Sequence, residues 1–177
     1  MAKTTNRRDD LLEAALTAFV ERGYEGTSVA DLAEATDLSK AAFVYHFDSK
    51  EDLLFELAGP LLDDLDAVVE RHAESTGDLG ELTHDYLDVL CRHRAAAEWI
   101  DGDKSILNHG DLGQRLDDNN RQVHALIAGD EPSAVARAQA SAVLGMLWRP
   151  IRNGHLGDDA SSRRAVADLA AAAAASI

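Results

Sequence analysis

Residues 23–54 read GYEGTSVADLAEATDLSKAAFVYHFDSKEDLL, and this stretch decides the fold. Ser28 and Asp31 stand three residues apart, which is the spacing of a capping box at the start of a helix. Leu32 and its apolar neighbours then share one helical face. We therefore predict a short helix that opens at Thr27 or Ser28 and ends a few residues after Leu32.

A second short helix is predicted after a tight turn. Ser39 can cap it, and Phe43 and Phe47 stand four residues apart, so both rings belong to its buried face. Helical geometry then turns the other side chains outward, namely Lys40, Ala41, Val44 and Tyr45. This face combines one cation, one aromatic ring and small groups that allow a partner to approach closely.

A longer helix is predicted before the two short ones, with Asn6 as its cap and Gly23 as its end. Its apolar residues recur on one helical face: Leu11, Leu12, Ala15, Leu16, Phe19 and Val20. Two short helices that are joined by a tight turn and crossed by a preceding helix form a helix-turn-helix, whose second helix enters the major groove of DNA. Residues 39–46 are therefore the predicted recognition helix.

The rest of the chain is predicted to be helical as well. A long leucine-rich helix starts at Ser49, and Gly59 and Pro60 are expected to kink or restart it. Glycine-rich breaks divide the remainder into about five segments, and no segment alternates like a strand. The predicted fold class is all-α, with a three-helix helix-turn-helix DNA-binding domain over residues 1–48 and a helical effector-binding and dimerisation domain over residues 49–177.

These motifs resemble the TetR-like (AcrR/TetR) one-component transcriptional regulators over about residues 7–55. The resemblance is carried by GYEGTSV at 23–29, DLA at 31–33, LSK at 38–40 and YHFDSKEDLL at 45–54. It implies a homodimer of all-helical subunits, each with an N-terminal DNA-reading unit and a C-terminal domain that binds an effector and dimerises through its last two long helices.

The resemblance also implies roles for single residues. Thr27, His46 and Lys50 are expected at phosphates, whereas Lys40, Ala41, Ala42 and Tyr45 are expected near bases. Hydroxyl groups at helix ends are further candidates for phosphate binding, because backbone N–H groups are free there. The predicted DNA-binding residues are Thr27, Ser28, Ser39, Lys40, Ala41, Ala42, Val44, Tyr45, His46 and Lys50.

Two residues depart from the family pattern. Asp37 stands in the turn where glycine is usual, and we expect it to adopt the left-handed backbone conformation that Asp and Asn tolerate better than most residues. Val44 stands where a phosphate-binding tyrosine is usual, so this contact is lost or moved to Tyr45. The operator preference of relatives therefore does not transfer.

An effector site is predicted between the helices that follow Leu57, since clefts between helices of a bundle often bind ligands. The candidate lining residues are Tyr86, His93, Trp99, His109 and Trp148, with His124 and Met146 as further polar or aromatic neighbours. The alternative is that each is an ordinary core or surface residue. We expect a small, largely apolar effector and neither a metal nor another cofactor, because no pair of histidines has the spacing of a helical metal site.

A dimer interface is predicted on the last two helices. One stripe of mostly small side chains runs along residues 134–148, and a second lies on the final helix. Paired with their symmetry mates, they form a four-helix contact. The stripes consist of Val135, Ala138, Ala142 and Gly145, and of Val166, Leu169 and Ala173. The alternative is an alanine-rich monomer core.

The predicted function is a ligand-responsive transcriptional regulator, a repressor that reads a palindromic operator as a homodimer and is released by a small molecule. An enzyme is not expected, because phosphate-loop, nucleophile-elbow and zinc motifs are missing from the sequence. The alternative is a ligand-binding dimer that has lost specific DNA binding, which Asp37, Val44 and the acidic N-terminal unit favour. Cys91 is a candidate redox thiol, with Arg94 lowering its pKa, or a buried inert one.

Charge is the feature that conflicts with DNA binding. The formal net charge is −15, with Asp 21, Glu 11, Arg 13 and Lys 4 among 177 residues. Together with 31 alanines, this composition is typical of proteins from extreme halophiles. The acidity then reflects the solvent and not the partner. Since the N-terminal residues MAKTTNRRDD lack an apolar run, we expect a cytoplasmic location and no membrane partner.

The net charge generates a prediction about salt. At about 1 M ionic strength the Debye length falls to ~3 Å, so repulsion between distant carboxylates, and between the protein and DNA, is screened. We expect the free energy of unfolding to increase between dilute buffer and molar KCl. DNA affinity should stay flat or rise, whereas that of ordinary DNA-binding proteins falls steeply. Urea unfolding and DNA titrations across this range test both points, and a steep fall in affinity would contradict the halophile interpretation.

Overall fold

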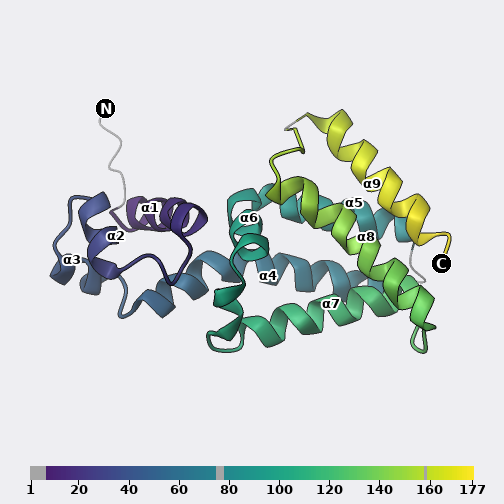
Figure 1. Ribbon diagram of the computed structural model, residues 1–177, viewed down its shortest axis with the longest axis horizontal. Helices are drawn as coiled ribbons and strands as arrows, with labels where there is room; N and C mark the ends of the chain where they lie inside the picture. The colour runs from purple at the N-terminus through teal and green to yellow at the C-terminus, as the bar shows by residue number, and fades with distance from the viewer. Residues whose placement is uncertain (1–6, 75–77, 158) are drawn as a thin grey trace.

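The computed structural model describes residues 7–74, 78–157 and 159–177, and all regular elements within these ranges are helical, as the sequence predicts. Asn6, the predicted cap of the first helix, lies outside the described residues. Figure 1 shows the elements, which are α1 (Arg7–Arg22), α2 (Val29–Ala35), α3 (Lys40–His46), α4 (Lys50–Glu74), α5 (Leu79–Arg92), α6 (Arg94–Gly102), the 3-10 helix η1 (Lys104–Asn108), α7 (Leu112–Ala128), α8 (Ala134–Arg152) and α9 (Ala160–Ala174).

The helices form two groups that α4 connects (Figure 1). The helices α1, α2 and α3 gather at one end of the elongated protein, and we call them the head. The helices α5 to α9 gather at the other end and are called the body. The helix α4 starts beside the head and continues along the body, where it packs against α5, α6 and α7. The head is thereby held at one end of the molecule.

The turn between α2 and α3 is a complete Schellman motif. The N–H of Leu38 donates to the carbonyl of Ala33 at 2.8 Å, and the N–H of Asp37 donates to that of Glu34 at 3.2 Å. Asp37 has φ 53°, so the predicted left-handed conformation of this residue is confirmed. The motif reverses the chain within three residues and fixes the angle at which α3 leaves α2.

Both short helices of the head begin with the predicted caps. The Ser28 and Asp31 side chains and backbone groups form a capping box at the start of α2. The Oγ of Ser39 accepts a hydrogen bond from the N–H of Ala42 at 3.1 Å. These bonds satisfy N–H groups that a helix of only seven residues would otherwise leave to water.

The head meets the body where α1 packs on α6. The ring of Phe19 stacks on the indole of Trp99, with centroids 5.1 Å apart and an interplanar angle of 25°. The N–H of Tyr24 donates to the Asp103 carboxylate just after α6, at 2.5 Å. Burial alone would raise the pKa of Asp103, but hydrogen bonds from Ser105 and Tyr24 outweigh it and hold this pKa below its usual range. The contact therefore combines a buried aromatic pair with a charge-assisted hydrogen bond.

Two sequence predictions need correction, and for α4 one of two predicted outcomes is excluded. The chain breaks at His93, between α5 and α6, although neither glycine nor proline stands there. The helix α4 runs through Gly59 and Pro60 without restarting. Val20 is 39% exposed and lies off the buried face of α1. Within the described residues, no helix has the length and apolar character needed to cross a membrane.

The Schellman turn generates a prediction about residue 37. A residue with a Cβ pays about 1–2 kcal/mol for the left-handed conformation, which glycine adopts freely. We expect Asp37→Ala to be less stable than Asp37→Gly by about 1 kcal/mol in urea unfolding, with Asp37 itself between the two. Equal stability of the Ala and Gly variants would show that the turn does not require this conformation.

Candidate nucleic-acid interface

The helix α3 presents a face to solvent that no other part of the described protein covers. Phe43 and Phe47 are buried in the head with their ring centroids 5.9 Å apart. Lys40 and Ala41 are exposed on the opposite side, together with Val44. This arrangement agrees with the predicted division of α3 into a buried and an outward face.

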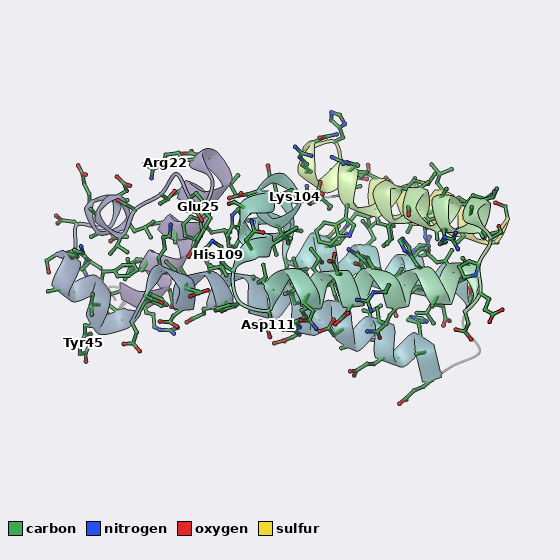
Figure 2. All side chains as sticks on the ribbon, turned by 60° about the horizontal axis from the view of Figure 1, so that its bottom comes forward. Arg22, Glu25, Tyr45, Lys104, His109 and Asp111 are labelled. Atoms are coloured by element: carbon green, nitrogen blue, oxygen red, sulfur yellow. The ribbon has the colours of Figure 1, made fainter. Side chains whose placement is uncertain are left out.

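Tyr45 is the most prominent side chain of this face, with 86% of its surface exposed. It projects away from the protein at the far end of the head (Figure 2). The imidazole of His46 packs edge-on against its ring, with centroids 5.3 Å apart and an interplanar angle of 83°. An exposed aromatic ring that is supported by a neighbour contributes little to the core, and it is well suited to contact a partner.

The predicted residue Thr27 is buried, with 1% of its surface exposed. Its hydroxyl donates to the carbonyl of Gly23 at 2.9 Å, and its N–H donates to the carbonyl of Tyr24 at 3.2 Å. Neither donor is directed at solvent, so the predicted phosphate contact of Thr27 is wrong for this structure. Thr27 instead closes the turn between α1 and α2.

Ser28 and Ser39 stay at the surface, but both hydroxyls serve as helix caps. The hydroxyl of Ser28 donates to Asp31 at 2.6 Å and accepts from the N–H of Asp31 at 3.2 Å. The hydroxyl and the backbone N–H of Ser28 both donate to the Asp31 carboxylate, and these two hydrogen bonds lower the pKa of Asp31. A carboxylate therefore lies beside the hydroxyl that was predicted to bind a phosphate. Ala42 is half-buried and lies between the two faces of α3.

Lys50 has a structural role that the sequence did not reveal. Its Nζ donates to the carbonyls of Tyr24 and Thr27, at 2.9 and 3.1 Å. The same ammonium lies over the ring of Tyr24, 3.9 Å from its centroid. Burial, followed by the charges of Glu51 and Glu25, raises the pKa of Tyr24 to about 12. Two of the three donors of Lys50 therefore hold α4 to the turn after α1.

His109 was predicted to line an effector site, but it belongs to the contact between head and body. Its Nε2 lies 2.9 Å from a carboxylate oxygen of Glu25, and its ring packs edge-on against Tyr24 with centroids 4.6 Å apart. Figure 2 shows His109 and Glu25 facing one another at this contact. His93 lies elsewhere, 2.8 Å from Asp64 on α4, so the two histidines do not meet at one site.

The remaining predicted pocket residues also separate. Tyr86 is fully buried and donates its hydroxyl to Oδ1 of Asn119 at 3.2 Å; burial raises its pKa. Trp99 belongs to the aromatic stack with Phe19. Trp148 lines a crevice of about 240 Å³ between α6, α7 and α8, and we call it the inner crevice. The five predicted residues thus do not form one site.

The inner crevice mixes apolar and polar walls. Its apolar side chains include Ile100, Leu116 and Leu144, and its polar ones include Asp101, Asn120, His124 and Ser141. Burial lowers the pKa of His124, which favours the neutral imidazole. Asp101 and Asn120 carry no motif or spacing in the sequence that could have identified them, because three helices bring them together only in the folded protein.

The predicted dimer stripes leave large apolar side chains uncovered. Val135 is 67% and Leu169 is 62% exposed. Ala138 and Ala142 are exposed too, and a Cβ added at Gly145 would meet nothing within 4 Å. Val166 and Ala173 are half-buried. An apolar face of this kind on α8 and α9 can be covered by a second copy of the chain.

The head is similar in sequence to a known protein family. Residues 11–57 match the family described as bacterial regulatory proteins, tetR family. The chain is 34% identical over 108 residues to the HTH-type transcriptional repressor KstR2 of Rhodococcus jostii, which covers 58% of this chain and 53% of that protein. It is 48% identical over 56 residues to the HTH-type transcriptional repressor AcnR of Corynebacterium glutamicum, which covers 32% of this chain and 30% of that protein. The chain thus spans about half or less of the length of these relatives.

The whole chain shares its fold with a solved structure. The ketosteroid transcriptional regulator KstR2 of Mycobacterium tuberculosis superposes with a TM-score of 0.76 over 99% of this chain and 96% of that chain. Sequence identity in this pair is 20%. The head therefore carries the tetR-type helix-turn-helix, as the motifs at residues 23–54 indicated, and the body follows the same all-helical architecture.

The contacts of Lys50 generate a prediction about the stability of the protein. Lys50→Met removes two hydrogen bonds from a charged donor, one to the Thr27 carbonyl and one to the Tyr24 carbonyl, which keeps its bond from the N–H of Thr27. We therefore expect the free energy of unfolding to fall by about 1–3 kcal/mol. Lys40→Met is the matched control, because Lys40 is exposed. It should stay within about 0.5 kcal/mol of the unmodified protein. Urea unfolding of both variants measures the difference, and equal stabilities would remove the structural role of Lys50.

Proposed function

We propose that this chain is a DNA-binding transcriptional repressor of the tetR family, which acts as a homodimer and responds to a small molecule. The observation that carries the proposal is the division of α3: Phe43 is buried in the head, while Lys40, Ala41 and Tyr45 face solvent. The match of residues 11–57 to the family and the similarity to two repressors support it.

The outward face of α3 is proposed to read bases in the major groove. Ala41 leaves space for the helix to approach the base edges, and Lys40 at the first turn can donate to guanine. Tyr45 extends farthest and can stack on the sugar-phosphate backbone or contact a thymine methyl group. His46 and the half-buried Ala42 complete the face. Residues 1–48 are proposed as the DNA-binding domain, and residues 49–177 as the effector-binding and dimerisation domain.

A homodimer is proposed through the apolar stripes of α8 and α9. Exposed Val135 and Leu169 lose contact with water when two copies meet. The exposed, small side chains of Ala138 and Ala142 allow two α8 helices to approach closely. Such a two-fold dimer reads a palindromic operator, because its two recognition helices are related by the same symmetry as the half-sites.

The inner crevice is proposed as the effector site. Its volume of about 240 Å³ suits a small, largely apolar molecule with one or two polar groups. Ile100 and Asp101 line the crevice, and the neighbouring Trp99 and Asp103 hold the head. A ligand that displaces α6 therefore acts directly on the contact with α1. It changes DNA affinity only through its different affinities for the two positions of the head.

A second candidate function is a ligand-binding dimer without specific DNA affinity. The internal contacts of Thr27 and Lys50 favour it, since two expected phosphate contacts are committed to the fold. The acidic head favours it too, with nine anions against six cations over residues 1–50. A gel shift on the DNA upstream of the chain's own gene separates the two, because only the repressor gives a retarded band that specific competitor DNA removes.

The exposure of Tyr45 generates a prediction about sequence preference. Tyr45→Ala should leave the free energy of unfolding unchanged, because this side chain is 86% exposed. It should weaken binding to the preferred DNA site by about 1–3 kcal/mol and change the ranking of altered sites. Gel shifts over a panel of site variants measure both effects, with His155→Ala as a control on the exposed segment between α8 and α9. An unchanged ranking would show that α3 does not read the sequence.

A further inference from the structure

A groove of about 920 Å³ lies on the outside of the body, between α5 and the first turns of α9. It shares no lining residue with the inner crevice. Leu87 and Ala167 form part of its apolar floor, and both are buried in the core. Cys91, the one cysteine in the sequence, also lines it. The volume is in the range of pockets that bind drug-sized molecules.

Guanidinium groups gather on the walls of this groove. Arg92 comes from α5, and Arg163 and Arg164 come from α9. The carboxylate of Asp88 is the acidic group that lines the groove. Cations therefore dominate this surface in a chain where Asp and Glu outnumber Lys and Arg by 32 to 17.

The two arginines of α9 differ from several other arginines of this protein. Arg71 pairs with Asp85, Arg92 with Asp64, and Arg115 with Asp63 and Asp66. In the part of the chain that the structure describes, no carboxylate forms an ion pair with Arg163 or Arg164.

Their position on the helix is also unfavourable. Arg163 is the fourth residue of α9, at the end of the first turn, where the helix dipole disfavours cations, and Arg164 follows it. Asp159 caps α9 by accepting hydrogen bonds from Ser161 and Ser162, and its carboxylate forms no ion pair with either arginine among the described residues. An anion bound in the groove would offset both the unpaired charges and the dipole.

Arg163 and Cys91 both line the groove, and the charge of Arg163 acts on the thiol. Burial nevertheless raises the pKa of Cys91, and it outweighs the charges of Arg94 and Arg163 that favour the thiolate. The redox role predicted from a lowered pKa is therefore wrong. The thiol behaves as part of the apolar floor, with the cationic groups above it.

The groove stays open in the proposed dimer. At about 100° per residue, the five positions of α9 that line the groove, among them Arg163, Arg164 and Ala167, are centred about 160° around the helix axis from the stripe of Val166 and Leu169. A second copy that covers the stripe therefore does not reach the groove.

From these observations we propose that the groove between α5 and α9 is a second ligand site. It takes an organic anion with an apolar chain and a carboxylate or phosphate group. Arg163 and Arg164 bind the anionic group of the ligand, because guanidinium groups match the geometry of carboxylates and phosphates. The apolar chain of the ligand lies over Leu87, Cys91 and Ala167. The site is separate from the effector crevice and requires neither DNA nor dimer contacts.

Octanoate and octyl phosphate are suitable probes, and Cys91 provides the readout. We expect saturating octanoate to slow alkylation of Cys91 by iodoacetamide at least five-fold, as followed by mass spectrometry of the full chain. Acetate has the carboxylate without the apolar chain, and 1-octanol has the apolar chain without a charge. Neither should give protection at the same concentration. Protection by octyl phosphate as well would assign the site to oxyanions in general, and protection by octanoate alone would assign it to carboxylates. Equal protection by 1-octanol, or none by either anion at 10 mM, would overturn the proposal.

Arginine variants test where the anionic group of the ligand binds. Arg164→Gln should weaken octanoate binding at least ten-fold in calorimetry, and the double variant with Arg163→Gln should weaken it further. Arg137→Gln is the matched control, since this exposed arginine of α8 donates to the carbonyl of Pro132 and lies outside the groove. It should bind octanoate like the unmodified protein. Circular dichroism confirms that each variant is folded, and unchanged affinity in a folded double variant would overturn the assignment of the arginines.

Discussion

The stack of Phe19 on Trp99 is the contact on which the arrangement of the protein depends. It joins α1 of the head to α6 of the body, and both rings are buried. The hydrogen bond from Tyr24 to Asp103 and the contacts of Lys50 hold the same end of α1 from two further directions. Since the Schellman turn fixes α3 relative to α2, the orientation of the outward face of α3 depends on how α1 packs on α6.

The head was largely predictable from the sequence because its structure is set by local interactions. The caps at Ser28 and Ser39 and the left-handed Asp37 each involve residues that are close in the chain. The roles of Thr27 and Lys50 were not predictable in the same way. A hydroxyl or ammonium at a helix end can bind a phosphate or a carbonyl, and only the packing of α4 against the turn after α1 shows which carbonyls are within reach.

The candidate effector site was less predictable, because three helices form it. Polar and aromatic residue types identified Trp148 and His124 but could not show that Tyr86 is enclosed in the core or that His109 faces Glu25. The break at His93 explains part of the difficulty. Residues 79–102 do not form one continuous helix, and the break at His93 leaves α6 free to pack on α1, where Trp99 meets Phe19.

The distribution of charge connects the fold with the proposed function. Many carboxylates of the body are paired with arginines that join helices, such as Asp63 and Asp66 of α4 with Arg115 of α7. The acidic composition is thus partly structural. Few cations remain near the outward face of α3. Lys40 is exposed there, whereas the ammonium of Lys50 on α4 is bound to backbone carbonyls. The proposed recognition of DNA by this head would therefore rely on shape and on Tyr45 more than on net charge.

The central claim is that two heads, each fixed on its body, are held at a spacing that matches DNA. The most direct measurement is the distance between spin labels at Ala41→Cys in a Cys91→Ala background, by double electron–electron resonance in molar KCl. One narrow distribution centred at about 35–40 Å is predicted, since successive major grooves on one side of DNA lie about 34–36 Å apart. The absence of a dipolar signal would contradict the dimer, and a broad distribution would contradict a head that α6 holds in place.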